Sequence, residues 1–275
     1  MDAILRILGR LGFLILLTAN PPAASKRLDG GRETRILAIT ASDFTFAAPD
    51  TMTAGLTAVY LRNEGLMPHH AWLVRLDEAR TLRELERELI ERGALPGWAV
   101  DAGGPGVVDP GGEARVTLLL TPGRHVILSG ERLPDGSTAV MRGMYHLVEV
   151  VGDAAEMPPP AADITVEMRQ GGVRVGGSLP AGRQRVLVLN RSKASSELRI
   201  YRLRAGQTMG ALLAWLNEES SPAPAYAVGG VVGLAPAAWA VLELALVRGE
   251  YVLIQRPPRM RHMSATVHAH VLRVR

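Results

Sequence analysis

The chain has 275 residues, of which 47% are hydrophobic and 21% charged, and these values exclude an intrinsically disordered chain. Its 31 basic residues stand against 27 acidic ones, and no basic stretch is interleaved with aromatic residues, which argues against nucleic-acid binding. The sequence has no cysteine, so disulfides, thiolate nucleophiles and thiolate metal ligands are excluded.

The first 24 residues are typical of a secretory signal peptide. Arg6 and Arg10 precede an apolar run at 11–19, and small residues and prolines follow. The apolar run is shorter than the ~20 residues that a helix needs to cross a bilayer. We therefore expect cleavage after Ala19 or Ala24, no membrane span in the mature chain, and a periplasmic or extracellular location. The alternative is that the segment is retained as an N-terminal anchor.

Short apolar runs bounded by Gly, Pro, Asn and Asp predict β-strands along the rest of the chain. These runs lie at 56–61, 71–76, 116–120 and 126–128, and again at 186–189, 198–203, 241–246 and 251–254. One helix is expected in each half. Thr81 and Glu84 form a capping box before leucines at helical spacing, and Gly93 ends that run. Thr208 and the leucines after it repeat the pattern. The stretch 103–106, which contains three glycines, is predicted to be a turn.

The two halves share one pattern at an offset of 127 residues, which changes to 126 after a single deletion. The repeat is visible in pairs of equivalent positions: Asn63 with Asn190, Thr81 with Thr208, Gly103-Gly104 with Gly229-Gly230, and Gly123 with Gly249. A proline-rich linker at 153–162 separates the copies, and its fixed φ angles favour an extended spacer. An internal repeat predicts similar tandem units. We expect an all-β chain of two Greek-key sandwiches, at 33–152 and 163–275, each with one inserted short helix.

Three segments of the first copy resemble the copper-binding segments of the cupredoxins of the plastocyanin and amicyanin type. The stretch from Asn63 to His70 is similar to the turn that carries the first copper histidine, and His69 takes the ligand position. The stretch from Gly123 to Ser129 resembles the strand that delivers the copper thiolate, with Ser129 at the cysteine position. Met141-Arg-Gly143 is similar to the segment that supplies the axial thioether. The resemblance implies a cupredoxin-like fold for both copies.

The same resemblance implies that the blue-copper centre is missing. Such a centre needs two histidines and a cysteine, with the axial methionine only a weak ligand. Here the cysteine position is Ser129, and no histidine occurs in the interval 136–140 before Met141. The second copy has Ser196 at the histidine position and Gln255 at the cysteine position. We therefore expect no resident cofactor, with copper as the alternative.

Two groups of methionine and histidine could still bind metal, because imidazole and thioether donors suit Cu(I). The first group consists of His69 and Met141, with His70, Met144 and His146 as weaker candidates. The second group lies near the C-terminus and consists of His262, His268 and His270. The alternative for both groups is that the methionines fill apolar gaps and the histidines are solvated or hydrogen-bonded.

Motifs of common enzyme classes are missing from the sequence, which has neither a phosphate-binding loop nor a Gly-x-Ser-x-Gly nucleophile elbow. The leading hypothesis is a non-enzymatic, exported module that binds an unidentified protein or small molecule. One alternative is a periplasmic protein that binds or transfers copper through the Met/His group. Another is a degenerate copper oxidoreductase.

Overall fold

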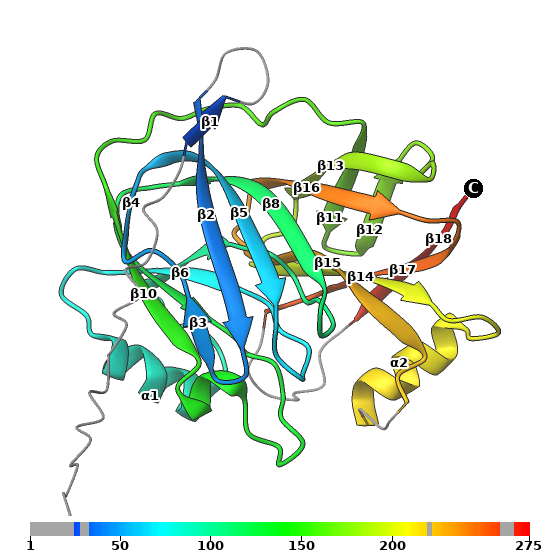
Figure 1. The fold of residues 1–275 in the computed structure, drawn as a ribbon, viewed down its shortest axis with the longest axis horizontal. Helices are drawn as coiled ribbons and strands as arrows, with labels where there is room; N and C mark the ends of the chain where they lie inside the picture. Colours follow the sequence, from blue (N-terminus) through cyan, green and yellow to red (C-terminus); the bar gives the residue numbers. More distant parts are fainter. Residues whose placement is uncertain (1–24, 28–32, 219–221, 259–266) are drawn as a thin grey trace, which may run out of the picture.

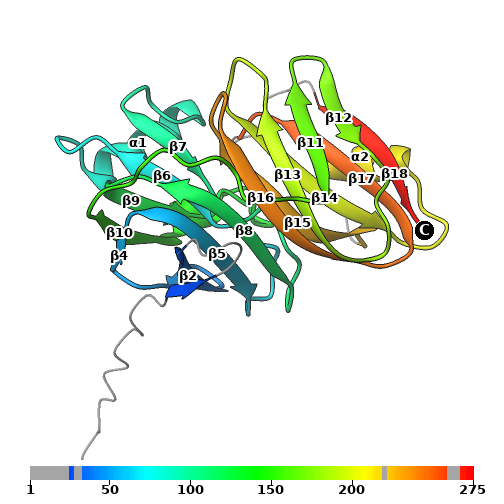
Figure 2. The same cartoon turned by 90° about the horizontal axis from the view of Figure 1, so that it is seen from above.

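The structure is a computed structural model that describes residues 25–27, 33–218, 222–258 and 267–275. The predicted signal peptide at 1–24 and the candidate ligand His262 lie outside these residues. Among the residues that are described, no helix is long and apolar enough to cross a membrane. The described chain consists mainly of strands with two α-helices (Figures 1 and 2).

All eight predicted strands are present, together with others. The strands of the first half are β1 (Ser25–Arg27), β2 (Glu33–Ser42), β3 (Thr45–Ala47), β4 (Thr51–Thr53), β5 (Gly55–Asn63), β6 (Trp72–Leu76), β7 (Ala99–Gly103), β8 (Glu113–Leu120), β9 (Gly123–Leu128) and β10 (Tyr145–Val151). Those of the second half are β11 (Ile164–Arg169), β12 (Gly172–Gly176), β13 (Gly182–Asn190), β14 (Ser196–Leu203), β15 (Ala225–Leu234), β16 (Trp239–Leu246), β17 (Gly249–Arg256) and β18 (His268–Val274).

The described strands form three sheets. A nine-stranded sheet has the order β1-β2-β5-β8-β16-β13-β11-β12, with β3 paired to β2. It faces a five-stranded sheet, β4-β10-β9-β6-β7, in the first half and a four-stranded sheet, β15-β14-β17-β18, in the second. One apolar core cluster lies between the sheets and contains buried residues of both halves, from Leu37 to Val274. Burial of these side chains on one face of each strand is the main force that holds the sandwiches together.

Both predicted helices are confirmed, and the first shows the predicted caps. Helix α1 (Leu82–Arg92) begins after Thr81, whose side chain accepts a hydrogen bond from the Glu84 N–H, while the Glu84 carboxylate accepts one from the Thr81 N–H. It ends at Gly93, which adopts a left-handed conformation with φ 67°. Buried leucines of α1 pack on the outer face of the five-stranded sheet. Helix α2 (Met209–Glu218) packs in the same way on the four-stranded sheet.

The two halves share the nine-stranded sheet because β8 pairs with β16 in antiparallel register. Val116 lies opposite Leu242, which is the residue 126 positions later in the chain. Strands β8 and β16 are equivalent strands of the two halves, and here two equivalent residues lie opposite each other. Antiparallel pairing of this kind has the geometry of a two-fold interface. At the junction the halves are therefore joined by the antiparallel pairing of three residues from each strand.

The prediction that 103–106 forms a turn is wrong. Gly103 ends strand β7, and the following residues contact the second half, where Gly106 N–H donates to Gly230 C=O and Val232 N–H donates to Gly104 C=O, both at 3.0 Å. These two bonds are also related by the 126-residue offset. The glycines are needed because Gly104 has φ 139° and lies against the backbone of Ala71, where a side chain has no room.

The linker separates the two halves and also forms part of the surface between them. It has no regular secondary structure, as expected, but it runs along the ends of the strands from β10 to β11 (Figure 1), and Pro160 is buried. Residues 159–161 form one wall of a cleft on the outer face of the nine-stranded sheet. The linker therefore borders the same cleft as strands of both halves.

Candidate functional site

A buried asparagine sets the loop that carries His69. Asn63 Nδ2 donates to the carbonyls of Met67 (2.8 Å) and Val108 (3.1 Å), and its Oδ1 accepts from the Gly65 N–H. Asn190 makes the equivalent bonds in the second half, to the carbonyls at 194 and 234. Because buried polar groups must be satisfied, this amide fixes the loop conformation in each half.

His69 is fully buried and lies between two side chains. Its Nδ1 is 3.3 Å from Ser129 Oγ, and its Nε2 is 3.3 Å from Asp43 Oδ1. Burial lowers the pKa of His69, and Asp43 offsets part of this, so the ring is neutral at pH 7. Burial raises the pKa of Asp43, but the Leu66 N–H and His69 outweigh it and hold that pKa below the ordinary value. An ionised carboxylate only accepts, so Nε2–H donates to Asp43 and Nδ1 accepts from the serine hydroxyl.

These residues do not fit a blue-copper ion. Both ring nitrogens of His69 already have partners, and the cysteine position holds the neutral hydroxyl of Ser129. Met141 lies on a short 3-10 helix, η1 (Ala139–Arg142), and is 40% exposed, whereas Met144 is fully buried in the core. One imidazole without a thiolate is too small a donor set for such a centre.

The Ser129–His69–Asp43 arrangement is also unsuited to hydrolysis, although it contains the residue types of a catalytic triad. A nucleophilic serine must reach a substrate carbonyl. Ser129 is fully buried, whereas Asp43, at the other end of this series of hydrogen bonds, is partly exposed to solvent. The arrangement therefore links three segments of the first half, at 43, 69 and 129, through hydrogen bonds of the buried His69 ring.

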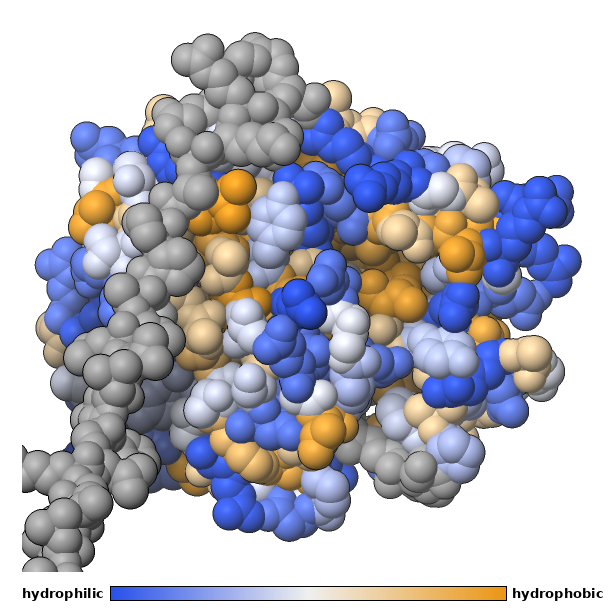
Figure 3. Space-filling model, viewed as in Figure 1, coloured by the Kyte–Doolittle hydropathy of each residue, from blue (hydrophilic) through white to orange (hydrophobic). Residues whose placement is uncertain are grey.

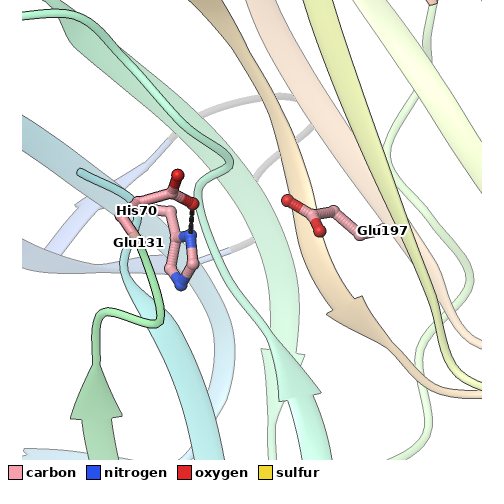
Figure 4. Close-up of side chains that lie close together, drawn as sticks. All are labelled: His70, Glu131 and Glu197. Carbon is pink, nitrogen blue, oxygen red and sulfur yellow. Dashed lines mark hydrogen bonds and ion pairs between the residues drawn. The ribbon is translucent and has the colours of Figure 1, made fainter. Parts of the chain in front are cut away.

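A second polar group, which we call the junction network, links the two halves. It consists of His70 and Glu131 from the first half and Glu197, Arg199 and Arg256 from the second. His70, Glu131 and Glu197 place their ligand-type atoms within 4.8 Å of one another (Figure 4). In the described part of the chain, this is the group of three His, Asp or Glu residues that is close enough to hold an ion.

Hydrogen bonds fix the protonation of the junction network. His70 Nε2 accepts from the Gly130 N–H at 3.0 Å, so the ring proton is on Nδ1, which donates to Glu131 Oε1 at 2.6 Å. Arg199 donates to both oxygens of Glu131 and, through Nε, to Glu197. Arg256 donates to the other oxygen of Glu197 at 2.9 Å. The negative charges of two carboxylates are therefore balanced by the positive charges of two guanidinium groups, and the imidazole beside them is neutral.

Burial disfavours each charge of the junction network, but the opposite charges outweigh it. Burial raises the pKa of Glu131 and of Glu197, yet Arg199 brings both pKa values below their ordinary range. The pKa of Arg199 is raised well above its ordinary value by the two glutamates, against the effect of burial. All three side chains are therefore charged at neutral pH.

The remaining candidate ligands lie elsewhere. His146, on β10, is 3.2 Å from Asp50 Oδ1. His268 and His270 lie on β18 opposite Gln255 and Leu253 of β17, and Gln255 donates to the carbonyl of Arg169. None of these histidines belongs to a close group of three His, Asp or Glu residues among the residues described. Metal binding by the C-terminal group stays a prediction.

Sequence reasoning missed the glutamates and arginines of the junction network and also Asp43. No motif surrounds them, and they meet only through the fold. The internal repeat gave one usable signal, because Glu197 stands 127 positions after His70 and thus at the equivalent position. Residues at equivalent positions near a two-fold relation are brought together across it.

A cleft of about 1540 Å³ opens on the outer face of the nine-stranded sheet and is lined by strands of both halves and by the linker. On its floor the Arg115 guanidinium lies 4.4 Å from the centre of the Tyr60 ring, and its Nη1 is 2.6 Å from Glu243 Oε2 across the β8–β16 pairing. Figure 3 shows hydrophobic surface between hydrophilic side chains on this face. Clefts at domain junctions with a few fixed polar groups are common ligand sites.

No family model matches the chain, and no curated protein does. Among solved structures, a multicopper oxidase is 12% identical and covers 93% of this chain and 94% of its own, with a TM-score of 0.29. Auracyanin A, a blue copper protein from Chloroflexus aurantiacus, is 14% identical over 43% of this chain and 99% of its own, with a TM-score of 0.31. Copper nitrite reductase from Nitrosomonas europaea is 14% identical over 87% and 93%, with a TM-score of 0.24. The all-β architecture of facing sheets with one short helix in each half, which the sequence predicts, is confirmed.

Another buried histidine, His125, gives the first sandwich a measurable pH dependence. It lies in the core with Nδ1 bonded to the Gly123 carbonyl at 2.9 Å, and burial lowers its pKa to about 4. Because the unfolded ring titrates near 6.5, the unfolded state gains a proton first as the pH falls. We expect the free energy of unfolding to fall by about 3 kcal/mol between pH 6.5 and pH 4 from this group.

Urea unfolding at a series of pH values measures this effect. The His125→Tyr variant is the matched test, because Tyr251 stands at the equivalent position of the second half and bonds its hydroxyl to the backbone of Val247. The variant should lose most of the slope between pH 6.5 and 4. An unchanged slope would contradict a neutral buried His125.

Proposed function

We propose that this chain is an exported, tandemly duplicated cupredoxin-like protein that acts as a non-enzymatic binding module without copper. The observation that carries the proposal is the position of His69, whose ring nitrogens are taken by Ser129 and Asp43. A side chain held in this way supports the fold of the loop instead of presenting a free donor to a metal. These residues do not supply the ligands that a blue-copper centre needs for electron transfer.

The duplication gives the module its binding surface. In this proposal, two equivalent halves fused through β8 and β16 produce one rigid sheet, and the cleft on that sheet exists only because both halves contribute. Its apolar positions, the Tyr60 ring and the Arg115–Glu243 pair suit a small molecule or peptide that is partly apolar and partly polar. The partner binds across the junction of the halves.

Two measurements on the mature chain test the proposal. In titrations with Cu(I) and Cu(II), we expect no sub-micromolar binding and no intense blue colour, and His69→Ala should change stability but not copper affinity. In an NMR screen of small fragments, chemical-shift changes should gather around Tyr60 and Ala245 in the cleft, with Tyr226 as the control aromatic outside it.

Other outcomes would support other functions. Sub-micromolar copper binding that is lost in His69→Ala would contradict the proposal and indicate a protein that binds or transfers copper. Copper binding that depends on His268 and His270 and is accompanied by turnover would indicate an oxidoreductase. Fragment binding that gathers away from the cleft would overturn the assignment of the binding surface.

A further inference from the structure

The junction network has the composition of a metal site. Imidazole nitrogen and carboxylate oxygen are common zinc ligands, and zinc takes them in a tetrahedral arrangement. His70, Glu131 and Glu197 bring one such atom each to within 4.8 Å of the others, and they come from both halves of the chain. These residues approach one another across the junction in Figure 4.

The place of the ion is taken by a side chain of the protein. The Arg199 guanidinium contacts Glu131 Oε1 at 2.5 Å, Glu131 Oε2 at 3.1 Å and Glu197 Oε1 at 2.5 Å. Arg199 is almost fully buried, as is Glu197, so water replaces none of these contacts. With Arg256 on the remaining oxygen of Glu197, no negative charge is left over to attract a metal ion.

We propose that Arg199 is the fixed cation of this site and that removing its guanidinium converts the junction network into a zinc-binding site. This inference is independent of the proposed binding function. Without Arg199, one buried carboxylate has no counter-charge, and such a group must gain a proton or a cation. His70 then supplies a nitrogen ligand as a neutral imidazole, which keeps one ring proton, and the proton released on metal binding is the one that the uncompensated carboxyl has gained.

The test uses the full mature chain and the variant Arg199→Met, which keeps the apolar bulk of the side chain. Zinc is added alone, and thermal unfolding and calorimetry are recorded. We expect zinc to leave the natural chain unchanged and to bind the variant at least tenfold more tightly. At zinc about 100-fold above its Kd, the ratio of folded to unfolded variant should rise about 100-fold. Zinc binding should release a proton and tighten as the pH rises.

Two controls separate this site from general effects of charge. Arg256→Met removes a guanidinium from the same carboxylate but leaves Arg199 in place, so it should lose stability and gain no zinc affinity. Arg199→Met combined with Glu197→Gln should lose the zinc effect, because one ligand is gone. Equal zinc binding by Arg256→Met and Arg199→Met would overturn the proposal.

The variant Arg199→Met can also be tested if it does not fold alone. It is then refolded with and without zinc, and recovery of the native circular dichroism with zinc, but not with a chelator, supports the proposal. A variant that folds but binds zinc no better than the natural chain overturns it. So does a variant that stays unfolded at saturating zinc.

Discussion

Replacing Gly230 by alanine is expected to lower the free energy of unfolding by about 3 kcal/mol or more. Gly230 has φ 136°, a region that is almost restricted to glycine. A Cβ at this position would lie 1.9 Å from the Leu198 carbonyl oxygen, so the backbone of β14 or β15 would have to move. That movement would also break the bond from Gly106 N–H to Gly230 C=O at the junction of the halves.

The effect of the clash can be separated from the effect of the φ angle. Gly177 also has a positive φ, 99°, but an added Cβ there meets nothing within 4 Å. Gly177→Ala should therefore show only the conformational cost of about 1–3 kcal/mol. Gly104→Ala should resemble Gly230→Ala, because its Cβ would lie 2.0 Å from the Ala71 carbonyl oxygen. Urea unfolding of the three variants measures the difference, and equal losses at 177 and 230 would contradict the role given to the junction.

The sequence predicts well those structural features that are determined by residues close to one another in the chain. The Thr81 capping box, the leucines of α1 and Gly93 lie within 13 positions of one another, so their pattern determines the helix locally. The strands follow from apolar runs and their boundaries in the same way. Asn63 and Asn190 were found as a repeated pair, and the structure gives their physical role in fixing a loop.

The features that sequence predicted poorly depend on contacts between distant segments. The glycines at 103–106 have the composition of a turn, but their conformation is set by contacts with Ala71 and with residues more than 120 positions away. Glu131 and Arg199 are 68 positions apart, and each alone is an ordinary charged residue of a strand or loop. His69 and Ser129 were assigned by resemblance, yet the partner that completes their arrangement, Asp43, lies in a separate β-hairpin turn.

The second large effect is expected from Glu197→Gln. Removing one partner from a buried ion pair leaves the other charge without compensation and costs about 3–5 kcal/mol. Here the change affects two partners, because Glu197 accepts from both Arg199 and Arg256. The matched surface control is Glu250→Gln, which breaks an exposed pair with Arg273 and should cost at most about 1 kcal/mol. Urea unfolding at pH 7 compares them, and similar small losses would show that the junction network contributes no more than a surface pair.

The same variant should separate two acid transitions. Because the pKa values of Glu131 and Glu197 are below their ordinary value of 4.5, their contribution to stability is complete above about pH 5 and is lost as the pH falls through the lowered values. The contribution from His125, whose pKa is lowered to about 4, is also lost as the pH falls, but in a higher range, between pH 6.5 and pH 4. Glu197→Gln should therefore weaken the decline below pH 4.5 and leave the decline above it unchanged. A variant that flattened the upper part of the curve would contradict the assignment of that decline to His125.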